Sequence, residues 1–249
     1  MSHISGDTDN HKAEGNLIPS SQWGNDVFVD AKLIEHNLLE INKKIAHCKP
    51  KIIGVTKYFG LNAMVNAYSV GIRAFGESRV NDAVFKIESL PSDIREDSEF
   101  HFIGHLQTNK VEKVVKYFDY IHSVDSLKLA KVISEVACRL NKREKVLLQV
   151  NNSGEEQKYG YDKGSLKREL QDIVSLKGIE VCGLMNMAPL GASEEYLRNL
   201  FRDLRCFRNE LQREYGIELP ELSMGMSDDY HLAIEEGATM IRIGRKLFK

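Results

Sequence analysis

The stretch KIIGVTK, residues Lys51–Lys57, predicts a short buried strand that ends in a lysine. The apolar or small residues 52–55 are typical of a parallel strand that is covered on both faces. An ammonium group at the end of such a strand is poorly solvated, and a neutral amine attacks carbonyl groups. Lys57 is therefore a candidate Schiff-base nucleophile. The alternative is a lysine that extends past the strand end into solvent.

Similar apolar runs recur along the chain and are separated by segments of helix length. They start near Ile72, Phe100, Tyr120, Val146, Ile179, Leu222 and Thr239. Together with the first strand they make eight predicted strands. A strand followed by a helix, eight times over, favours a single α/β domain of the (β/α)8 TIM-barrel type over an open doubly wound sheet.

The helices are predicted from apolar residues that recur on one face. Two clear cases are Leu127–Leu140 and Tyr196–Tyr215. A leading helix is predicted from Asp30, a plausible N-cap, to a point before Pro50, which a helix cannot include in its interior. Its apolar face consists of Ile34, Leu38, Ile41 and Ile45.

Composition excludes several classes of protein. The net charge is -2 and no run of lysine and arginine is longer than two residues, so nucleic acid is not an expected partner. We expect a cytoplasmic protein with no membrane association, because no apolar window is long enough for a membrane span or a signal peptide. The four cysteines are widely spaced, which predicts reduced thiols and no metal site. Residues 1–25 are polar and aperiodic and predict a disordered extension, so the barrel is assigned to residues 26–249.

Functional groups of a TIM barrel lie at the carboxyl ends of the strands, where Lys57 is predicted to lie. The predicted loops after strands seven and eight both carry glycine, which lets backbone N–H groups approach an anion, and these loops are the usual phosphate site of such barrels. A lysine that faces a phosphate site suggests a phosphorylated aldehyde, and pyridoxal 5'-phosphate is the natural candidate.

Seven motifs in order closely resemble the pyridoxal phosphate homeostasis protein family, also described as the proline synthetase co-transcribed family. The resemblance covers the chain from about Asp30 onward and implies an alanine racemase N-terminal-like barrel of the type III fold of pyridoxal phosphate proteins. The motifs are Val55-Thr56-Lys57, Phe75-Gly76-Glu77, His101-Phe102-Ile103-Gly104-His105-Leu106-Gln107-Thr108-Asn109-Lys110, Gln149-Val150-Asn151, Gly183-Leu184-Met185, Leu222-Ser223-Met224-Gly225-Met226-Ser227-Asp228-Asp229 and Arg242-Ile243-Gly244.

By this resemblance Lys57 matches the lysine that forms the internal aldimine, and Arg242 matches the arginine that faces the pyridine nitrogen. A direct ion pair between Arg242 and a carboxylate is the alternative. The positions that match phosphate contacts are Ser223, Met224, Gly244 and Arg245. His105 is a further candidate near the cofactor, although a histidine in a strand-end loop can equally orient the backbone.

The chain departs from the family pattern at three places. Tyr58-Phe59-Gly60 follows Lys57 where Thr-x-Pro is common, Ser78 replaces an asparagine, and Arg245 replaces a threonine or serine. The guanidinium of Arg245 is expected either to pair with the phosphate or to point outward. Glu77, Asp228 and Asp229 precede predicted helices, where favourable contact with the helix dipole is a sufficient role.

The resemblance implies a protein of intracellular pyridoxal phosphate homeostasis that holds the cofactor on Lys57 and has no catalytic residue. Apo-enzymes that need the cofactor are possible partners, and a monomer is expected. The alternatives are an amino acid racemase or decarboxylase and, less favoured, a phosphate-binding barrel without a cofactor. The two-domain racemases draw a second acid-base group from a C-terminal β domain, and no such domain is expected here because the chain ends at Lys249, soon after the eighth strand.

Overall fold

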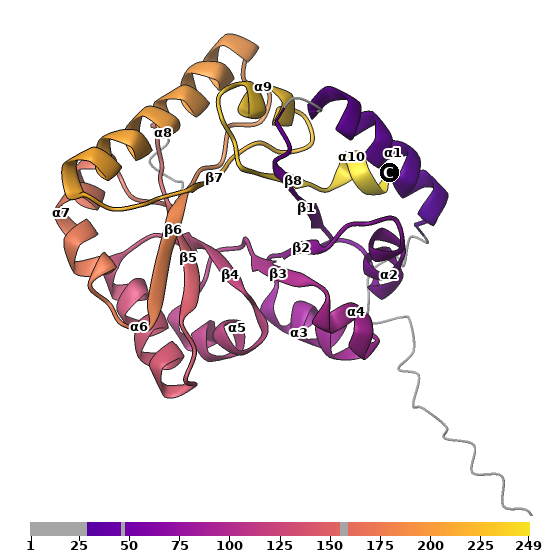
Figure 1. The fold of residues 1–249 in the computed structure, drawn as a ribbon, viewed down its shortest axis with the longest axis horizontal. Coiled ribbons are helices and arrows are strands. Elements are labelled where there is room, and N and C mark those ends of the chain that lie inside the picture. Colours follow the sequence, from indigo (N-terminus) through magenta and orange to yellow (C-terminus); the bar gives the residue numbers. More distant parts are fainter. Residues whose placement is uncertain (1–28, 46–47, 155–158) are drawn as a thin grey trace, which may run out of the picture.

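The computed structural model describes residues 29–45, 48–154 and 159–249, so the predicted disordered extension lies outside the described residues. Eight parallel strands close into a barrel in sequence order, and β8 pairs with β1 (Figure 1). Each strand begins within two residues of its predicted start, which confirms the TIM barrel. The strands are β1 (Lys51–Val55), β2 (Ala74–Glu77), β3 (Glu99–Phe102), β4 (Tyr120–Val124), β5 (Glu144–Gln149), β6 (Ile179–Met185), β7 (Glu221–Ser223) and β8 (Met240–Ile243).

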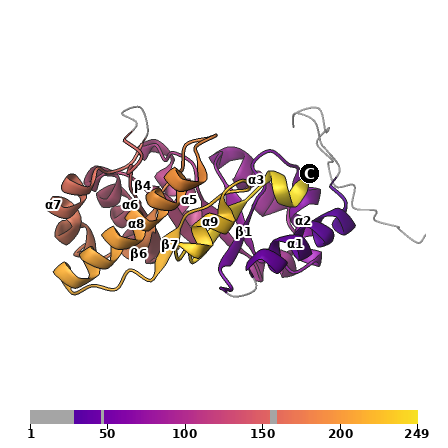
Figure 2. The same cartoon turned by 90° about the horizontal axis from the view of Figure 1, so that it is seen from above.

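The helices form a ring outside the strands, and the side view shows this ring as a single layer (Figure 2). Their bounds are α1 (Ala31–Ile45), α2 (Leu61–Ser69), α3 (Val80–Ser89), α4 (Ser92–Glu96), η2 (Thr108–Lys110), α5 (Val111–Tyr117), α6 (Leu127–Arg139), α7 (Lys163–Val174), α8 (Glu194–Tyr215), α9 (Tyr230–Glu235) and α10 (Arg245–Phe248). The two helices predicted from residues 127–140 and 196–215 correspond to α6 and α8.

Helix α1 is the predicted leading helix, and it lies beside α10 in both views (Figure 1, Figure 2). The α10 helix after β8 has only four residues. The side-chain amide of Asn37 on α1 donates to the carbonyl oxygens of Leu247 and Lys249, at 3.2 and 3.4 Å. The leading helix therefore covers the part of the barrel that the short last helix leaves open.

Apolar side chains fill two regions of the core. The larger region lies between the strands and the surrounding helices. The smaller lies inside the barrel and consists of Ile53, Ala74, Tyr120, Leu147, Cys182, Met185 and Met240. The strands of the barrel also carry buried polar side chains, among them His101, His122, Ser223 and Arg242. This polar part of the interior forms one side of the candidate site.

Candidate functional site at the carboxyl ends of the strands

Lys57 lies in a turn two residues beyond β1 and is half-buried. Its Nζ lies 5.0 Å from the centre of the Tyr58 ring. Within the described residues Lys57 makes no ion pair or hydrogen bond through its side chain. The turn is closed by a hydrogen bond of 2.9 Å from the N–H of Phe59 to the carbonyl oxygen of Thr56. The amine is therefore accessible and is not engaged by a carboxylate.

The turn around Lys57 is fastened by a second lysine, Lys86 on α3. Its Nζ donates to the carbonyl oxygens of Thr56 and Phe59, at 2.9 and 3.2 Å, on either side of Lys57. Lys86 also forms an ion pair with Glu77, and the two side chains are only 4% and 1% exposed. The hydroxyl of Thr56 donates to the same carboxylate at 2.7 Å.

Glu77 therefore does more than complement a helix dipole. Burial raises its pKa, and the nearby ammonium of Lys86 opposes this rise. Lys86 was not predicted from the sequence, because an isolated lysine on a helix resembles any solvated surface residue. The available signal was its position on the apolar face of α3, three residues after Ala83 and beside Ile87, both of which are buried.

Arg242 on β8 and Ser223 on β7 are in direct contact inside the barrel. The guanidinium Nη1 donates to the carbonyl oxygen and the hydroxyl of Ser223, at 2.8 and 2.6 Å. Nη2 donates to the carbonyl oxygen of Asn186 at 2.7 Å. Burial lowers the pKa of Arg242 to about 10, against the charge of Asp229, and the group stays a cation at neutral pH. In the described part of the chain Arg242 has no direct ion pair with a carboxylate, so that alternative is not found.

The loops after β7 and β8 are bonded to each other. The Ser227 oxygen accepts from the N–H groups of Gly244 and Lys246, at 3.3 and 3.2 Å. Gly225 adopts a φ of 90°, a conformation that side chains disfavour, and an added Cβ would lie 2.6 Å from the Cβ of Ala233. The glycine allows this tight turn beside α9.

The surroundings of three other predicted site residues can also be described. Met224 is buried, and its N–H donates to the carbonyl oxygen of Met240 at 3.2 Å. The side chain of Arg245 is 65% exposed and pairs with Asp228 at 2.7 Å, which is the outward arrangement. His105 is exposed and stacks on Tyr159 with ring centres 3.7 Å apart.

The described residues thus bring Ser223 and Arg242 into contact and Gly244 close to β1. A Cβ on Gly244 would lie 3.5 Å from Val55. His105 follows β3, and its Nδ1 lies 3.5 Å from Asp125 in the loop after β4. Residues 29–45, 48–154 and 159–249 contain no group of His, Cys, Asp or Glu side chains suited to a metal ion and no helix able to cross a membrane.

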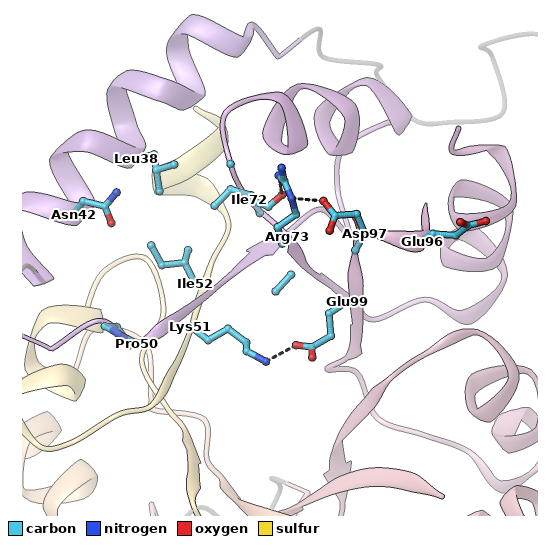
Figure 3. A pocket seen from close by; sticks show the side chains of 13 residues that line it. Leu38, Asn42, Pro50, Lys51, Ile52, Ile72, Arg73, Glu96, Asp97 and Glu99 are labelled. Carbon is cyan, nitrogen blue, oxygen red and sulfur yellow. Dashed lines mark hydrogen bonds and ion pairs between the residues drawn. The ribbon is translucent and has the colours of Figure 1, made fainter. Parts of the chain in front are cut away.

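A cavity of about 630 Å³ lies at the opposite end of the barrel, beside the start of β1, β2 and β3 (Figure 3). Its lysine and its arginine are already paired, Lys51 with Glu99 at 2.5 Å and Arg73 with Asp97 at 2.8 Å. The cavity therefore offers no unpaired lysine amine for the predicted carbonyl chemistry, which we expect at the carboxyl ends.

Comparisons with known proteins show the family of this chain. The family model described as alanine racemase, N-terminal domain, matches residues 29–249. The chain is 42% identical over 198 residues to a pyridoxal phosphate homeostasis protein of Synechocystis sp., with 80% of this chain and 90% of that protein covered. The chain belongs to this family. A pyridoxal phosphate homeostasis protein of Aquifex aeolicus is 43% identical over 198 residues, with 80% and 86% covered.

Solved structures of relatives agree with the fold of this family member. PipY of Synechococcus elongatus, solved with pyridoxal phosphate bound, is 38% identical and has a TM-score of 0.79, with 87% of this chain and all of PipY covered. Alanine racemase of Clostridium difficile has a TM-score of 0.72 at 18% identity, and the match covers 88% of this chain but only 57% of the racemase. The racemase therefore shares the barrel fold.

Proposed function

We infer that the protein binds pyridoxal 5'-phosphate through Lys57 and takes part in intracellular homeostasis of this cofactor. The observation that carries the inference lies on the neighbouring strands β1 and β8. A lysine amine without an ion pair in the described structure follows β1, and a buried guanidinium projects from β8. The names of the relatives and the bound cofactor of PipY support it.

The residues present fit the cofactor chemically. Bound pyridoxal phosphate supplies an aldehyde, with which an amine forms a reversible C=N bond and releases one water. Lys57 offers the amine. Three of the five guanidinium hydrogens of Arg242 go to protein oxygens in the described structure, which leaves donors for the lone pair of a pyridine nitrogen. The side-chain oxygen of Asn186 is buried without a hydrogen bond and could accept one from a ligand.

The phosphate is expected at the joined loops after β7 and β8. Because the Ser227 oxygen accepts two N–H groups, its hydroxyl hydrogen is available to donate to an anion. Contacts through Ser223, Met224, Gly244 and Arg245 remain predictions, as does proximity of His105. Since the guanidinium of Arg245 pairs with Asp228, its backbone N–H is the more suitable donor.

A carrier role is supported over amino acid racemisation or decarboxylation because the relatives are named homeostasis proteins and not enzymes. An arginine that is charged at neutral pH beside the pyridine nitrogen would also keep that nitrogen unprotonated, which weakens the ring as an electron sink. Delivery to apo-enzymes, a monomeric state and a cytoplasmic location complete the proposal. Racemase or decarboxylase turnover at about 1 per second or faster would contradict it.

Reductive trapping tests the central assignment. The full chain is incubated with pyridoxal phosphate, reduced with borohydride and digested, and mass spectrometry locates the modified lysine. We expect the modification on Lys57, and we expect Lys57→Ala to lose the visible absorption of the bound cofactor. Lys110→Ala removes another lysine at the same end of the barrel and serves as the matched control. Modification of a different lysine in the parent protein would refute the proposal.

A further inference from the structure

Five polar side chains form a continuous line through the barrel interior. Glu99 Oε1 lies 2.7 Å from Nε2 of His101, and Nδ1 of His101 lies 2.9 Å from Nε2 of His122. Nδ1 of His122 lies 2.9 Å from the hydroxyl of Ser223, which accepts from Arg242 at 2.6 Å. The line runs from the first residue of β3 to the carboxyl-end site and joins four strands.

The two ends of this line have opposite and fixed roles. Arg242 can only donate hydrogen bonds, because a guanidinium has no acceptor. Glu99 is its counterpart. Its burial would raise the pKa, but hydrogen bonds from His101 and Lys51 and the ammonium charge of Lys51 lower it to about 2, so the group is an ionised acceptor at neutral pH. It borders the amino-end cavity, where Figure 3 shows its ion pair with Lys51.

Because Glu99 can only accept and Arg242 can only donate, the positions of the protons on the two histidine rings between them are determined. Both histidines are fully buried, and burial lowers the pKa of each, so each ring is neutral with one donor and one acceptor nitrogen. His101 must donate from Nε2 to the carboxylate of Glu99, which leaves its Nδ1 as an acceptor. His122 must then donate from Nε2 to His101, which leaves its own Nδ1 as an acceptor.

The direction of the Ser223 hydroxyl hydrogen bond is determined in the same way. Since Nδ1 of His122 accepts, the hydroxyl of Ser223 donates to it, while the Ser223 oxygen accepts from Arg242. Every bond in the line then points in one direction, which lets the bonds polarise one another. If both rings instead carried the proton on Nδ1, the lone pair of His101 Nε2 would face a lone pair of the Glu99 carboxylate, and that hydrogen bond would be lost. A proton added to either ring would also break the order, and the charged or ionisable groups nearest the rings include Lys51, Asp119 and Tyr120.

We propose that His101 and His122 are positioning residues of the carboxyl-end site: His101 fixes the tautomer of His122, and Nδ1 of His122 accepts a hydrogen bond from the Ser223 hydroxyl, so that the Ser223 oxygen accepts from the Arg242 guanidinium. Ser223 then has no hydrogen to donate to a phosphate. In this arrangement the side chain of Ser223 orients Arg242. The consequence for cofactor binding rests on the proposed function, whereas the proton order can be measured without a cofactor.

The proton order is tested by nuclear magnetic resonance on the full cofactor-free chain with ¹⁵N-labelled histidine. Long-range ¹H–¹⁵N correlations distinguish the two neutral tautomers and the charged ring, and His101→Gln and His122→Gln assign the signals among the eight histidines. We expect both rings to be neutral with the proton on Nε2 at pH 7. A proton on Nδ1 of either ring, or a charged ring, would overturn the proposal.

The positioning role is tested with a matched pair of variants. His122→Leu removes the acceptor for the Ser223 hydroxyl, and we expect pyridoxal phosphate to bind about 10-fold more weakly, the upper effect of one neutral hydrogen bond. In His122→Asn the amide oxygen replaces Nδ1 as the acceptor, and we expect binding within about threefold of the parent. Unchanged binding in the leucine variant, or equal losses in both variants, would overturn the role. A parent that binds no cofactor would instead refute the proposed function, while the tautomer measurement would still stand.

Discussion

The buried ion pair of Lys86 and Glu77 makes the turn around Lys57 sensitive to one substitution. Lys86→Met keeps most of the apolar stem and removes the ammonium. The carboxylate of Glu77, which is 1% exposed, then retains only the hydrogen bond from Thr56 among the described residues. Removal of one partner from a buried pair costs about 3–5 kcal/mol, because the remaining charge is uncompensated. We expect the free energy of unfolding to fall by that amount.

Urea unfolding at pH 7, followed by circular dichroism, measures this loss from the midpoint at constant slope. Glu77→Gln added to Lys86→Met removes both charges, and we expect it to recover at least half of the loss. Lys43→Met breaks an ion pair whose side chains are 71% and 46% exposed, and we expect its midpoint to match the parent. A loss below about 1 kcal/mol in Lys86→Met, or no recovery in the double variant, would refute the assignment of a buried charge pair.

The same variant links the ion pair to the site. Lys86 holds the carbonyl groups on either side of Lys57, so its loss frees the turn that presents the amine. We expect Lys86→Met to slow borohydride trapping of pyridoxal phosphate on Lys57 under conditions in which the variant is still folded. An unchanged rate would show that the turn holds its shape without Lys86.

Three further outcomes are expected. Burial raises the pKa of Glu144 to about 7 from 4.5, so its ionisation destabilises the folded state increasingly as pH rises through this range. Glu144→Gln should therefore gain stability relative to the parent between those pH values, as measured by urea unfolding. Gly225→Ala should lose about 1–3 kcal/mol because of its positive φ and the contact with Ala233. The loss should exceed that of Gly191→Ala, where φ is also positive but no atom lies within 4 Å of the added Cβ. In a crystal structure with pyridoxal phosphate bound, a guanidinium nitrogen of Arg242 should lie within about 3.5 Å of the pyridine nitrogen, and a larger separation would refute its role.

The barrel could be predicted from the chain because its signals are local. Buried strands of three to seven residues leave short apolar runs, and the helices leave a period of 3.6 residues, as in α6 and α8. The place of Lys57 also followed, since the residue after a β strand of a TIM barrel lies at the carboxyl end. The position of α1 beside α10 could not be predicted, because the local sequence pattern of a leading helix does not show where in the ring of helices it packs.

The polar interior depended on tertiary structure. The alternation in Glu99-Phe100-His101-Phe102 places two polar residues on one face of β3, but it does not predict which side chains that face contacts. Barrel closure and strand register bring β3, β4, β7 and β8 together, and only then do the two histidines connect Glu99 to Arg242. The ion pair of Lys86 with Glu77 and the outward side chain of Arg245 were decided in the same way. Such contacts depend on distances between residues far apart in sequence, whereas periodicity reports only on neighbours along one element.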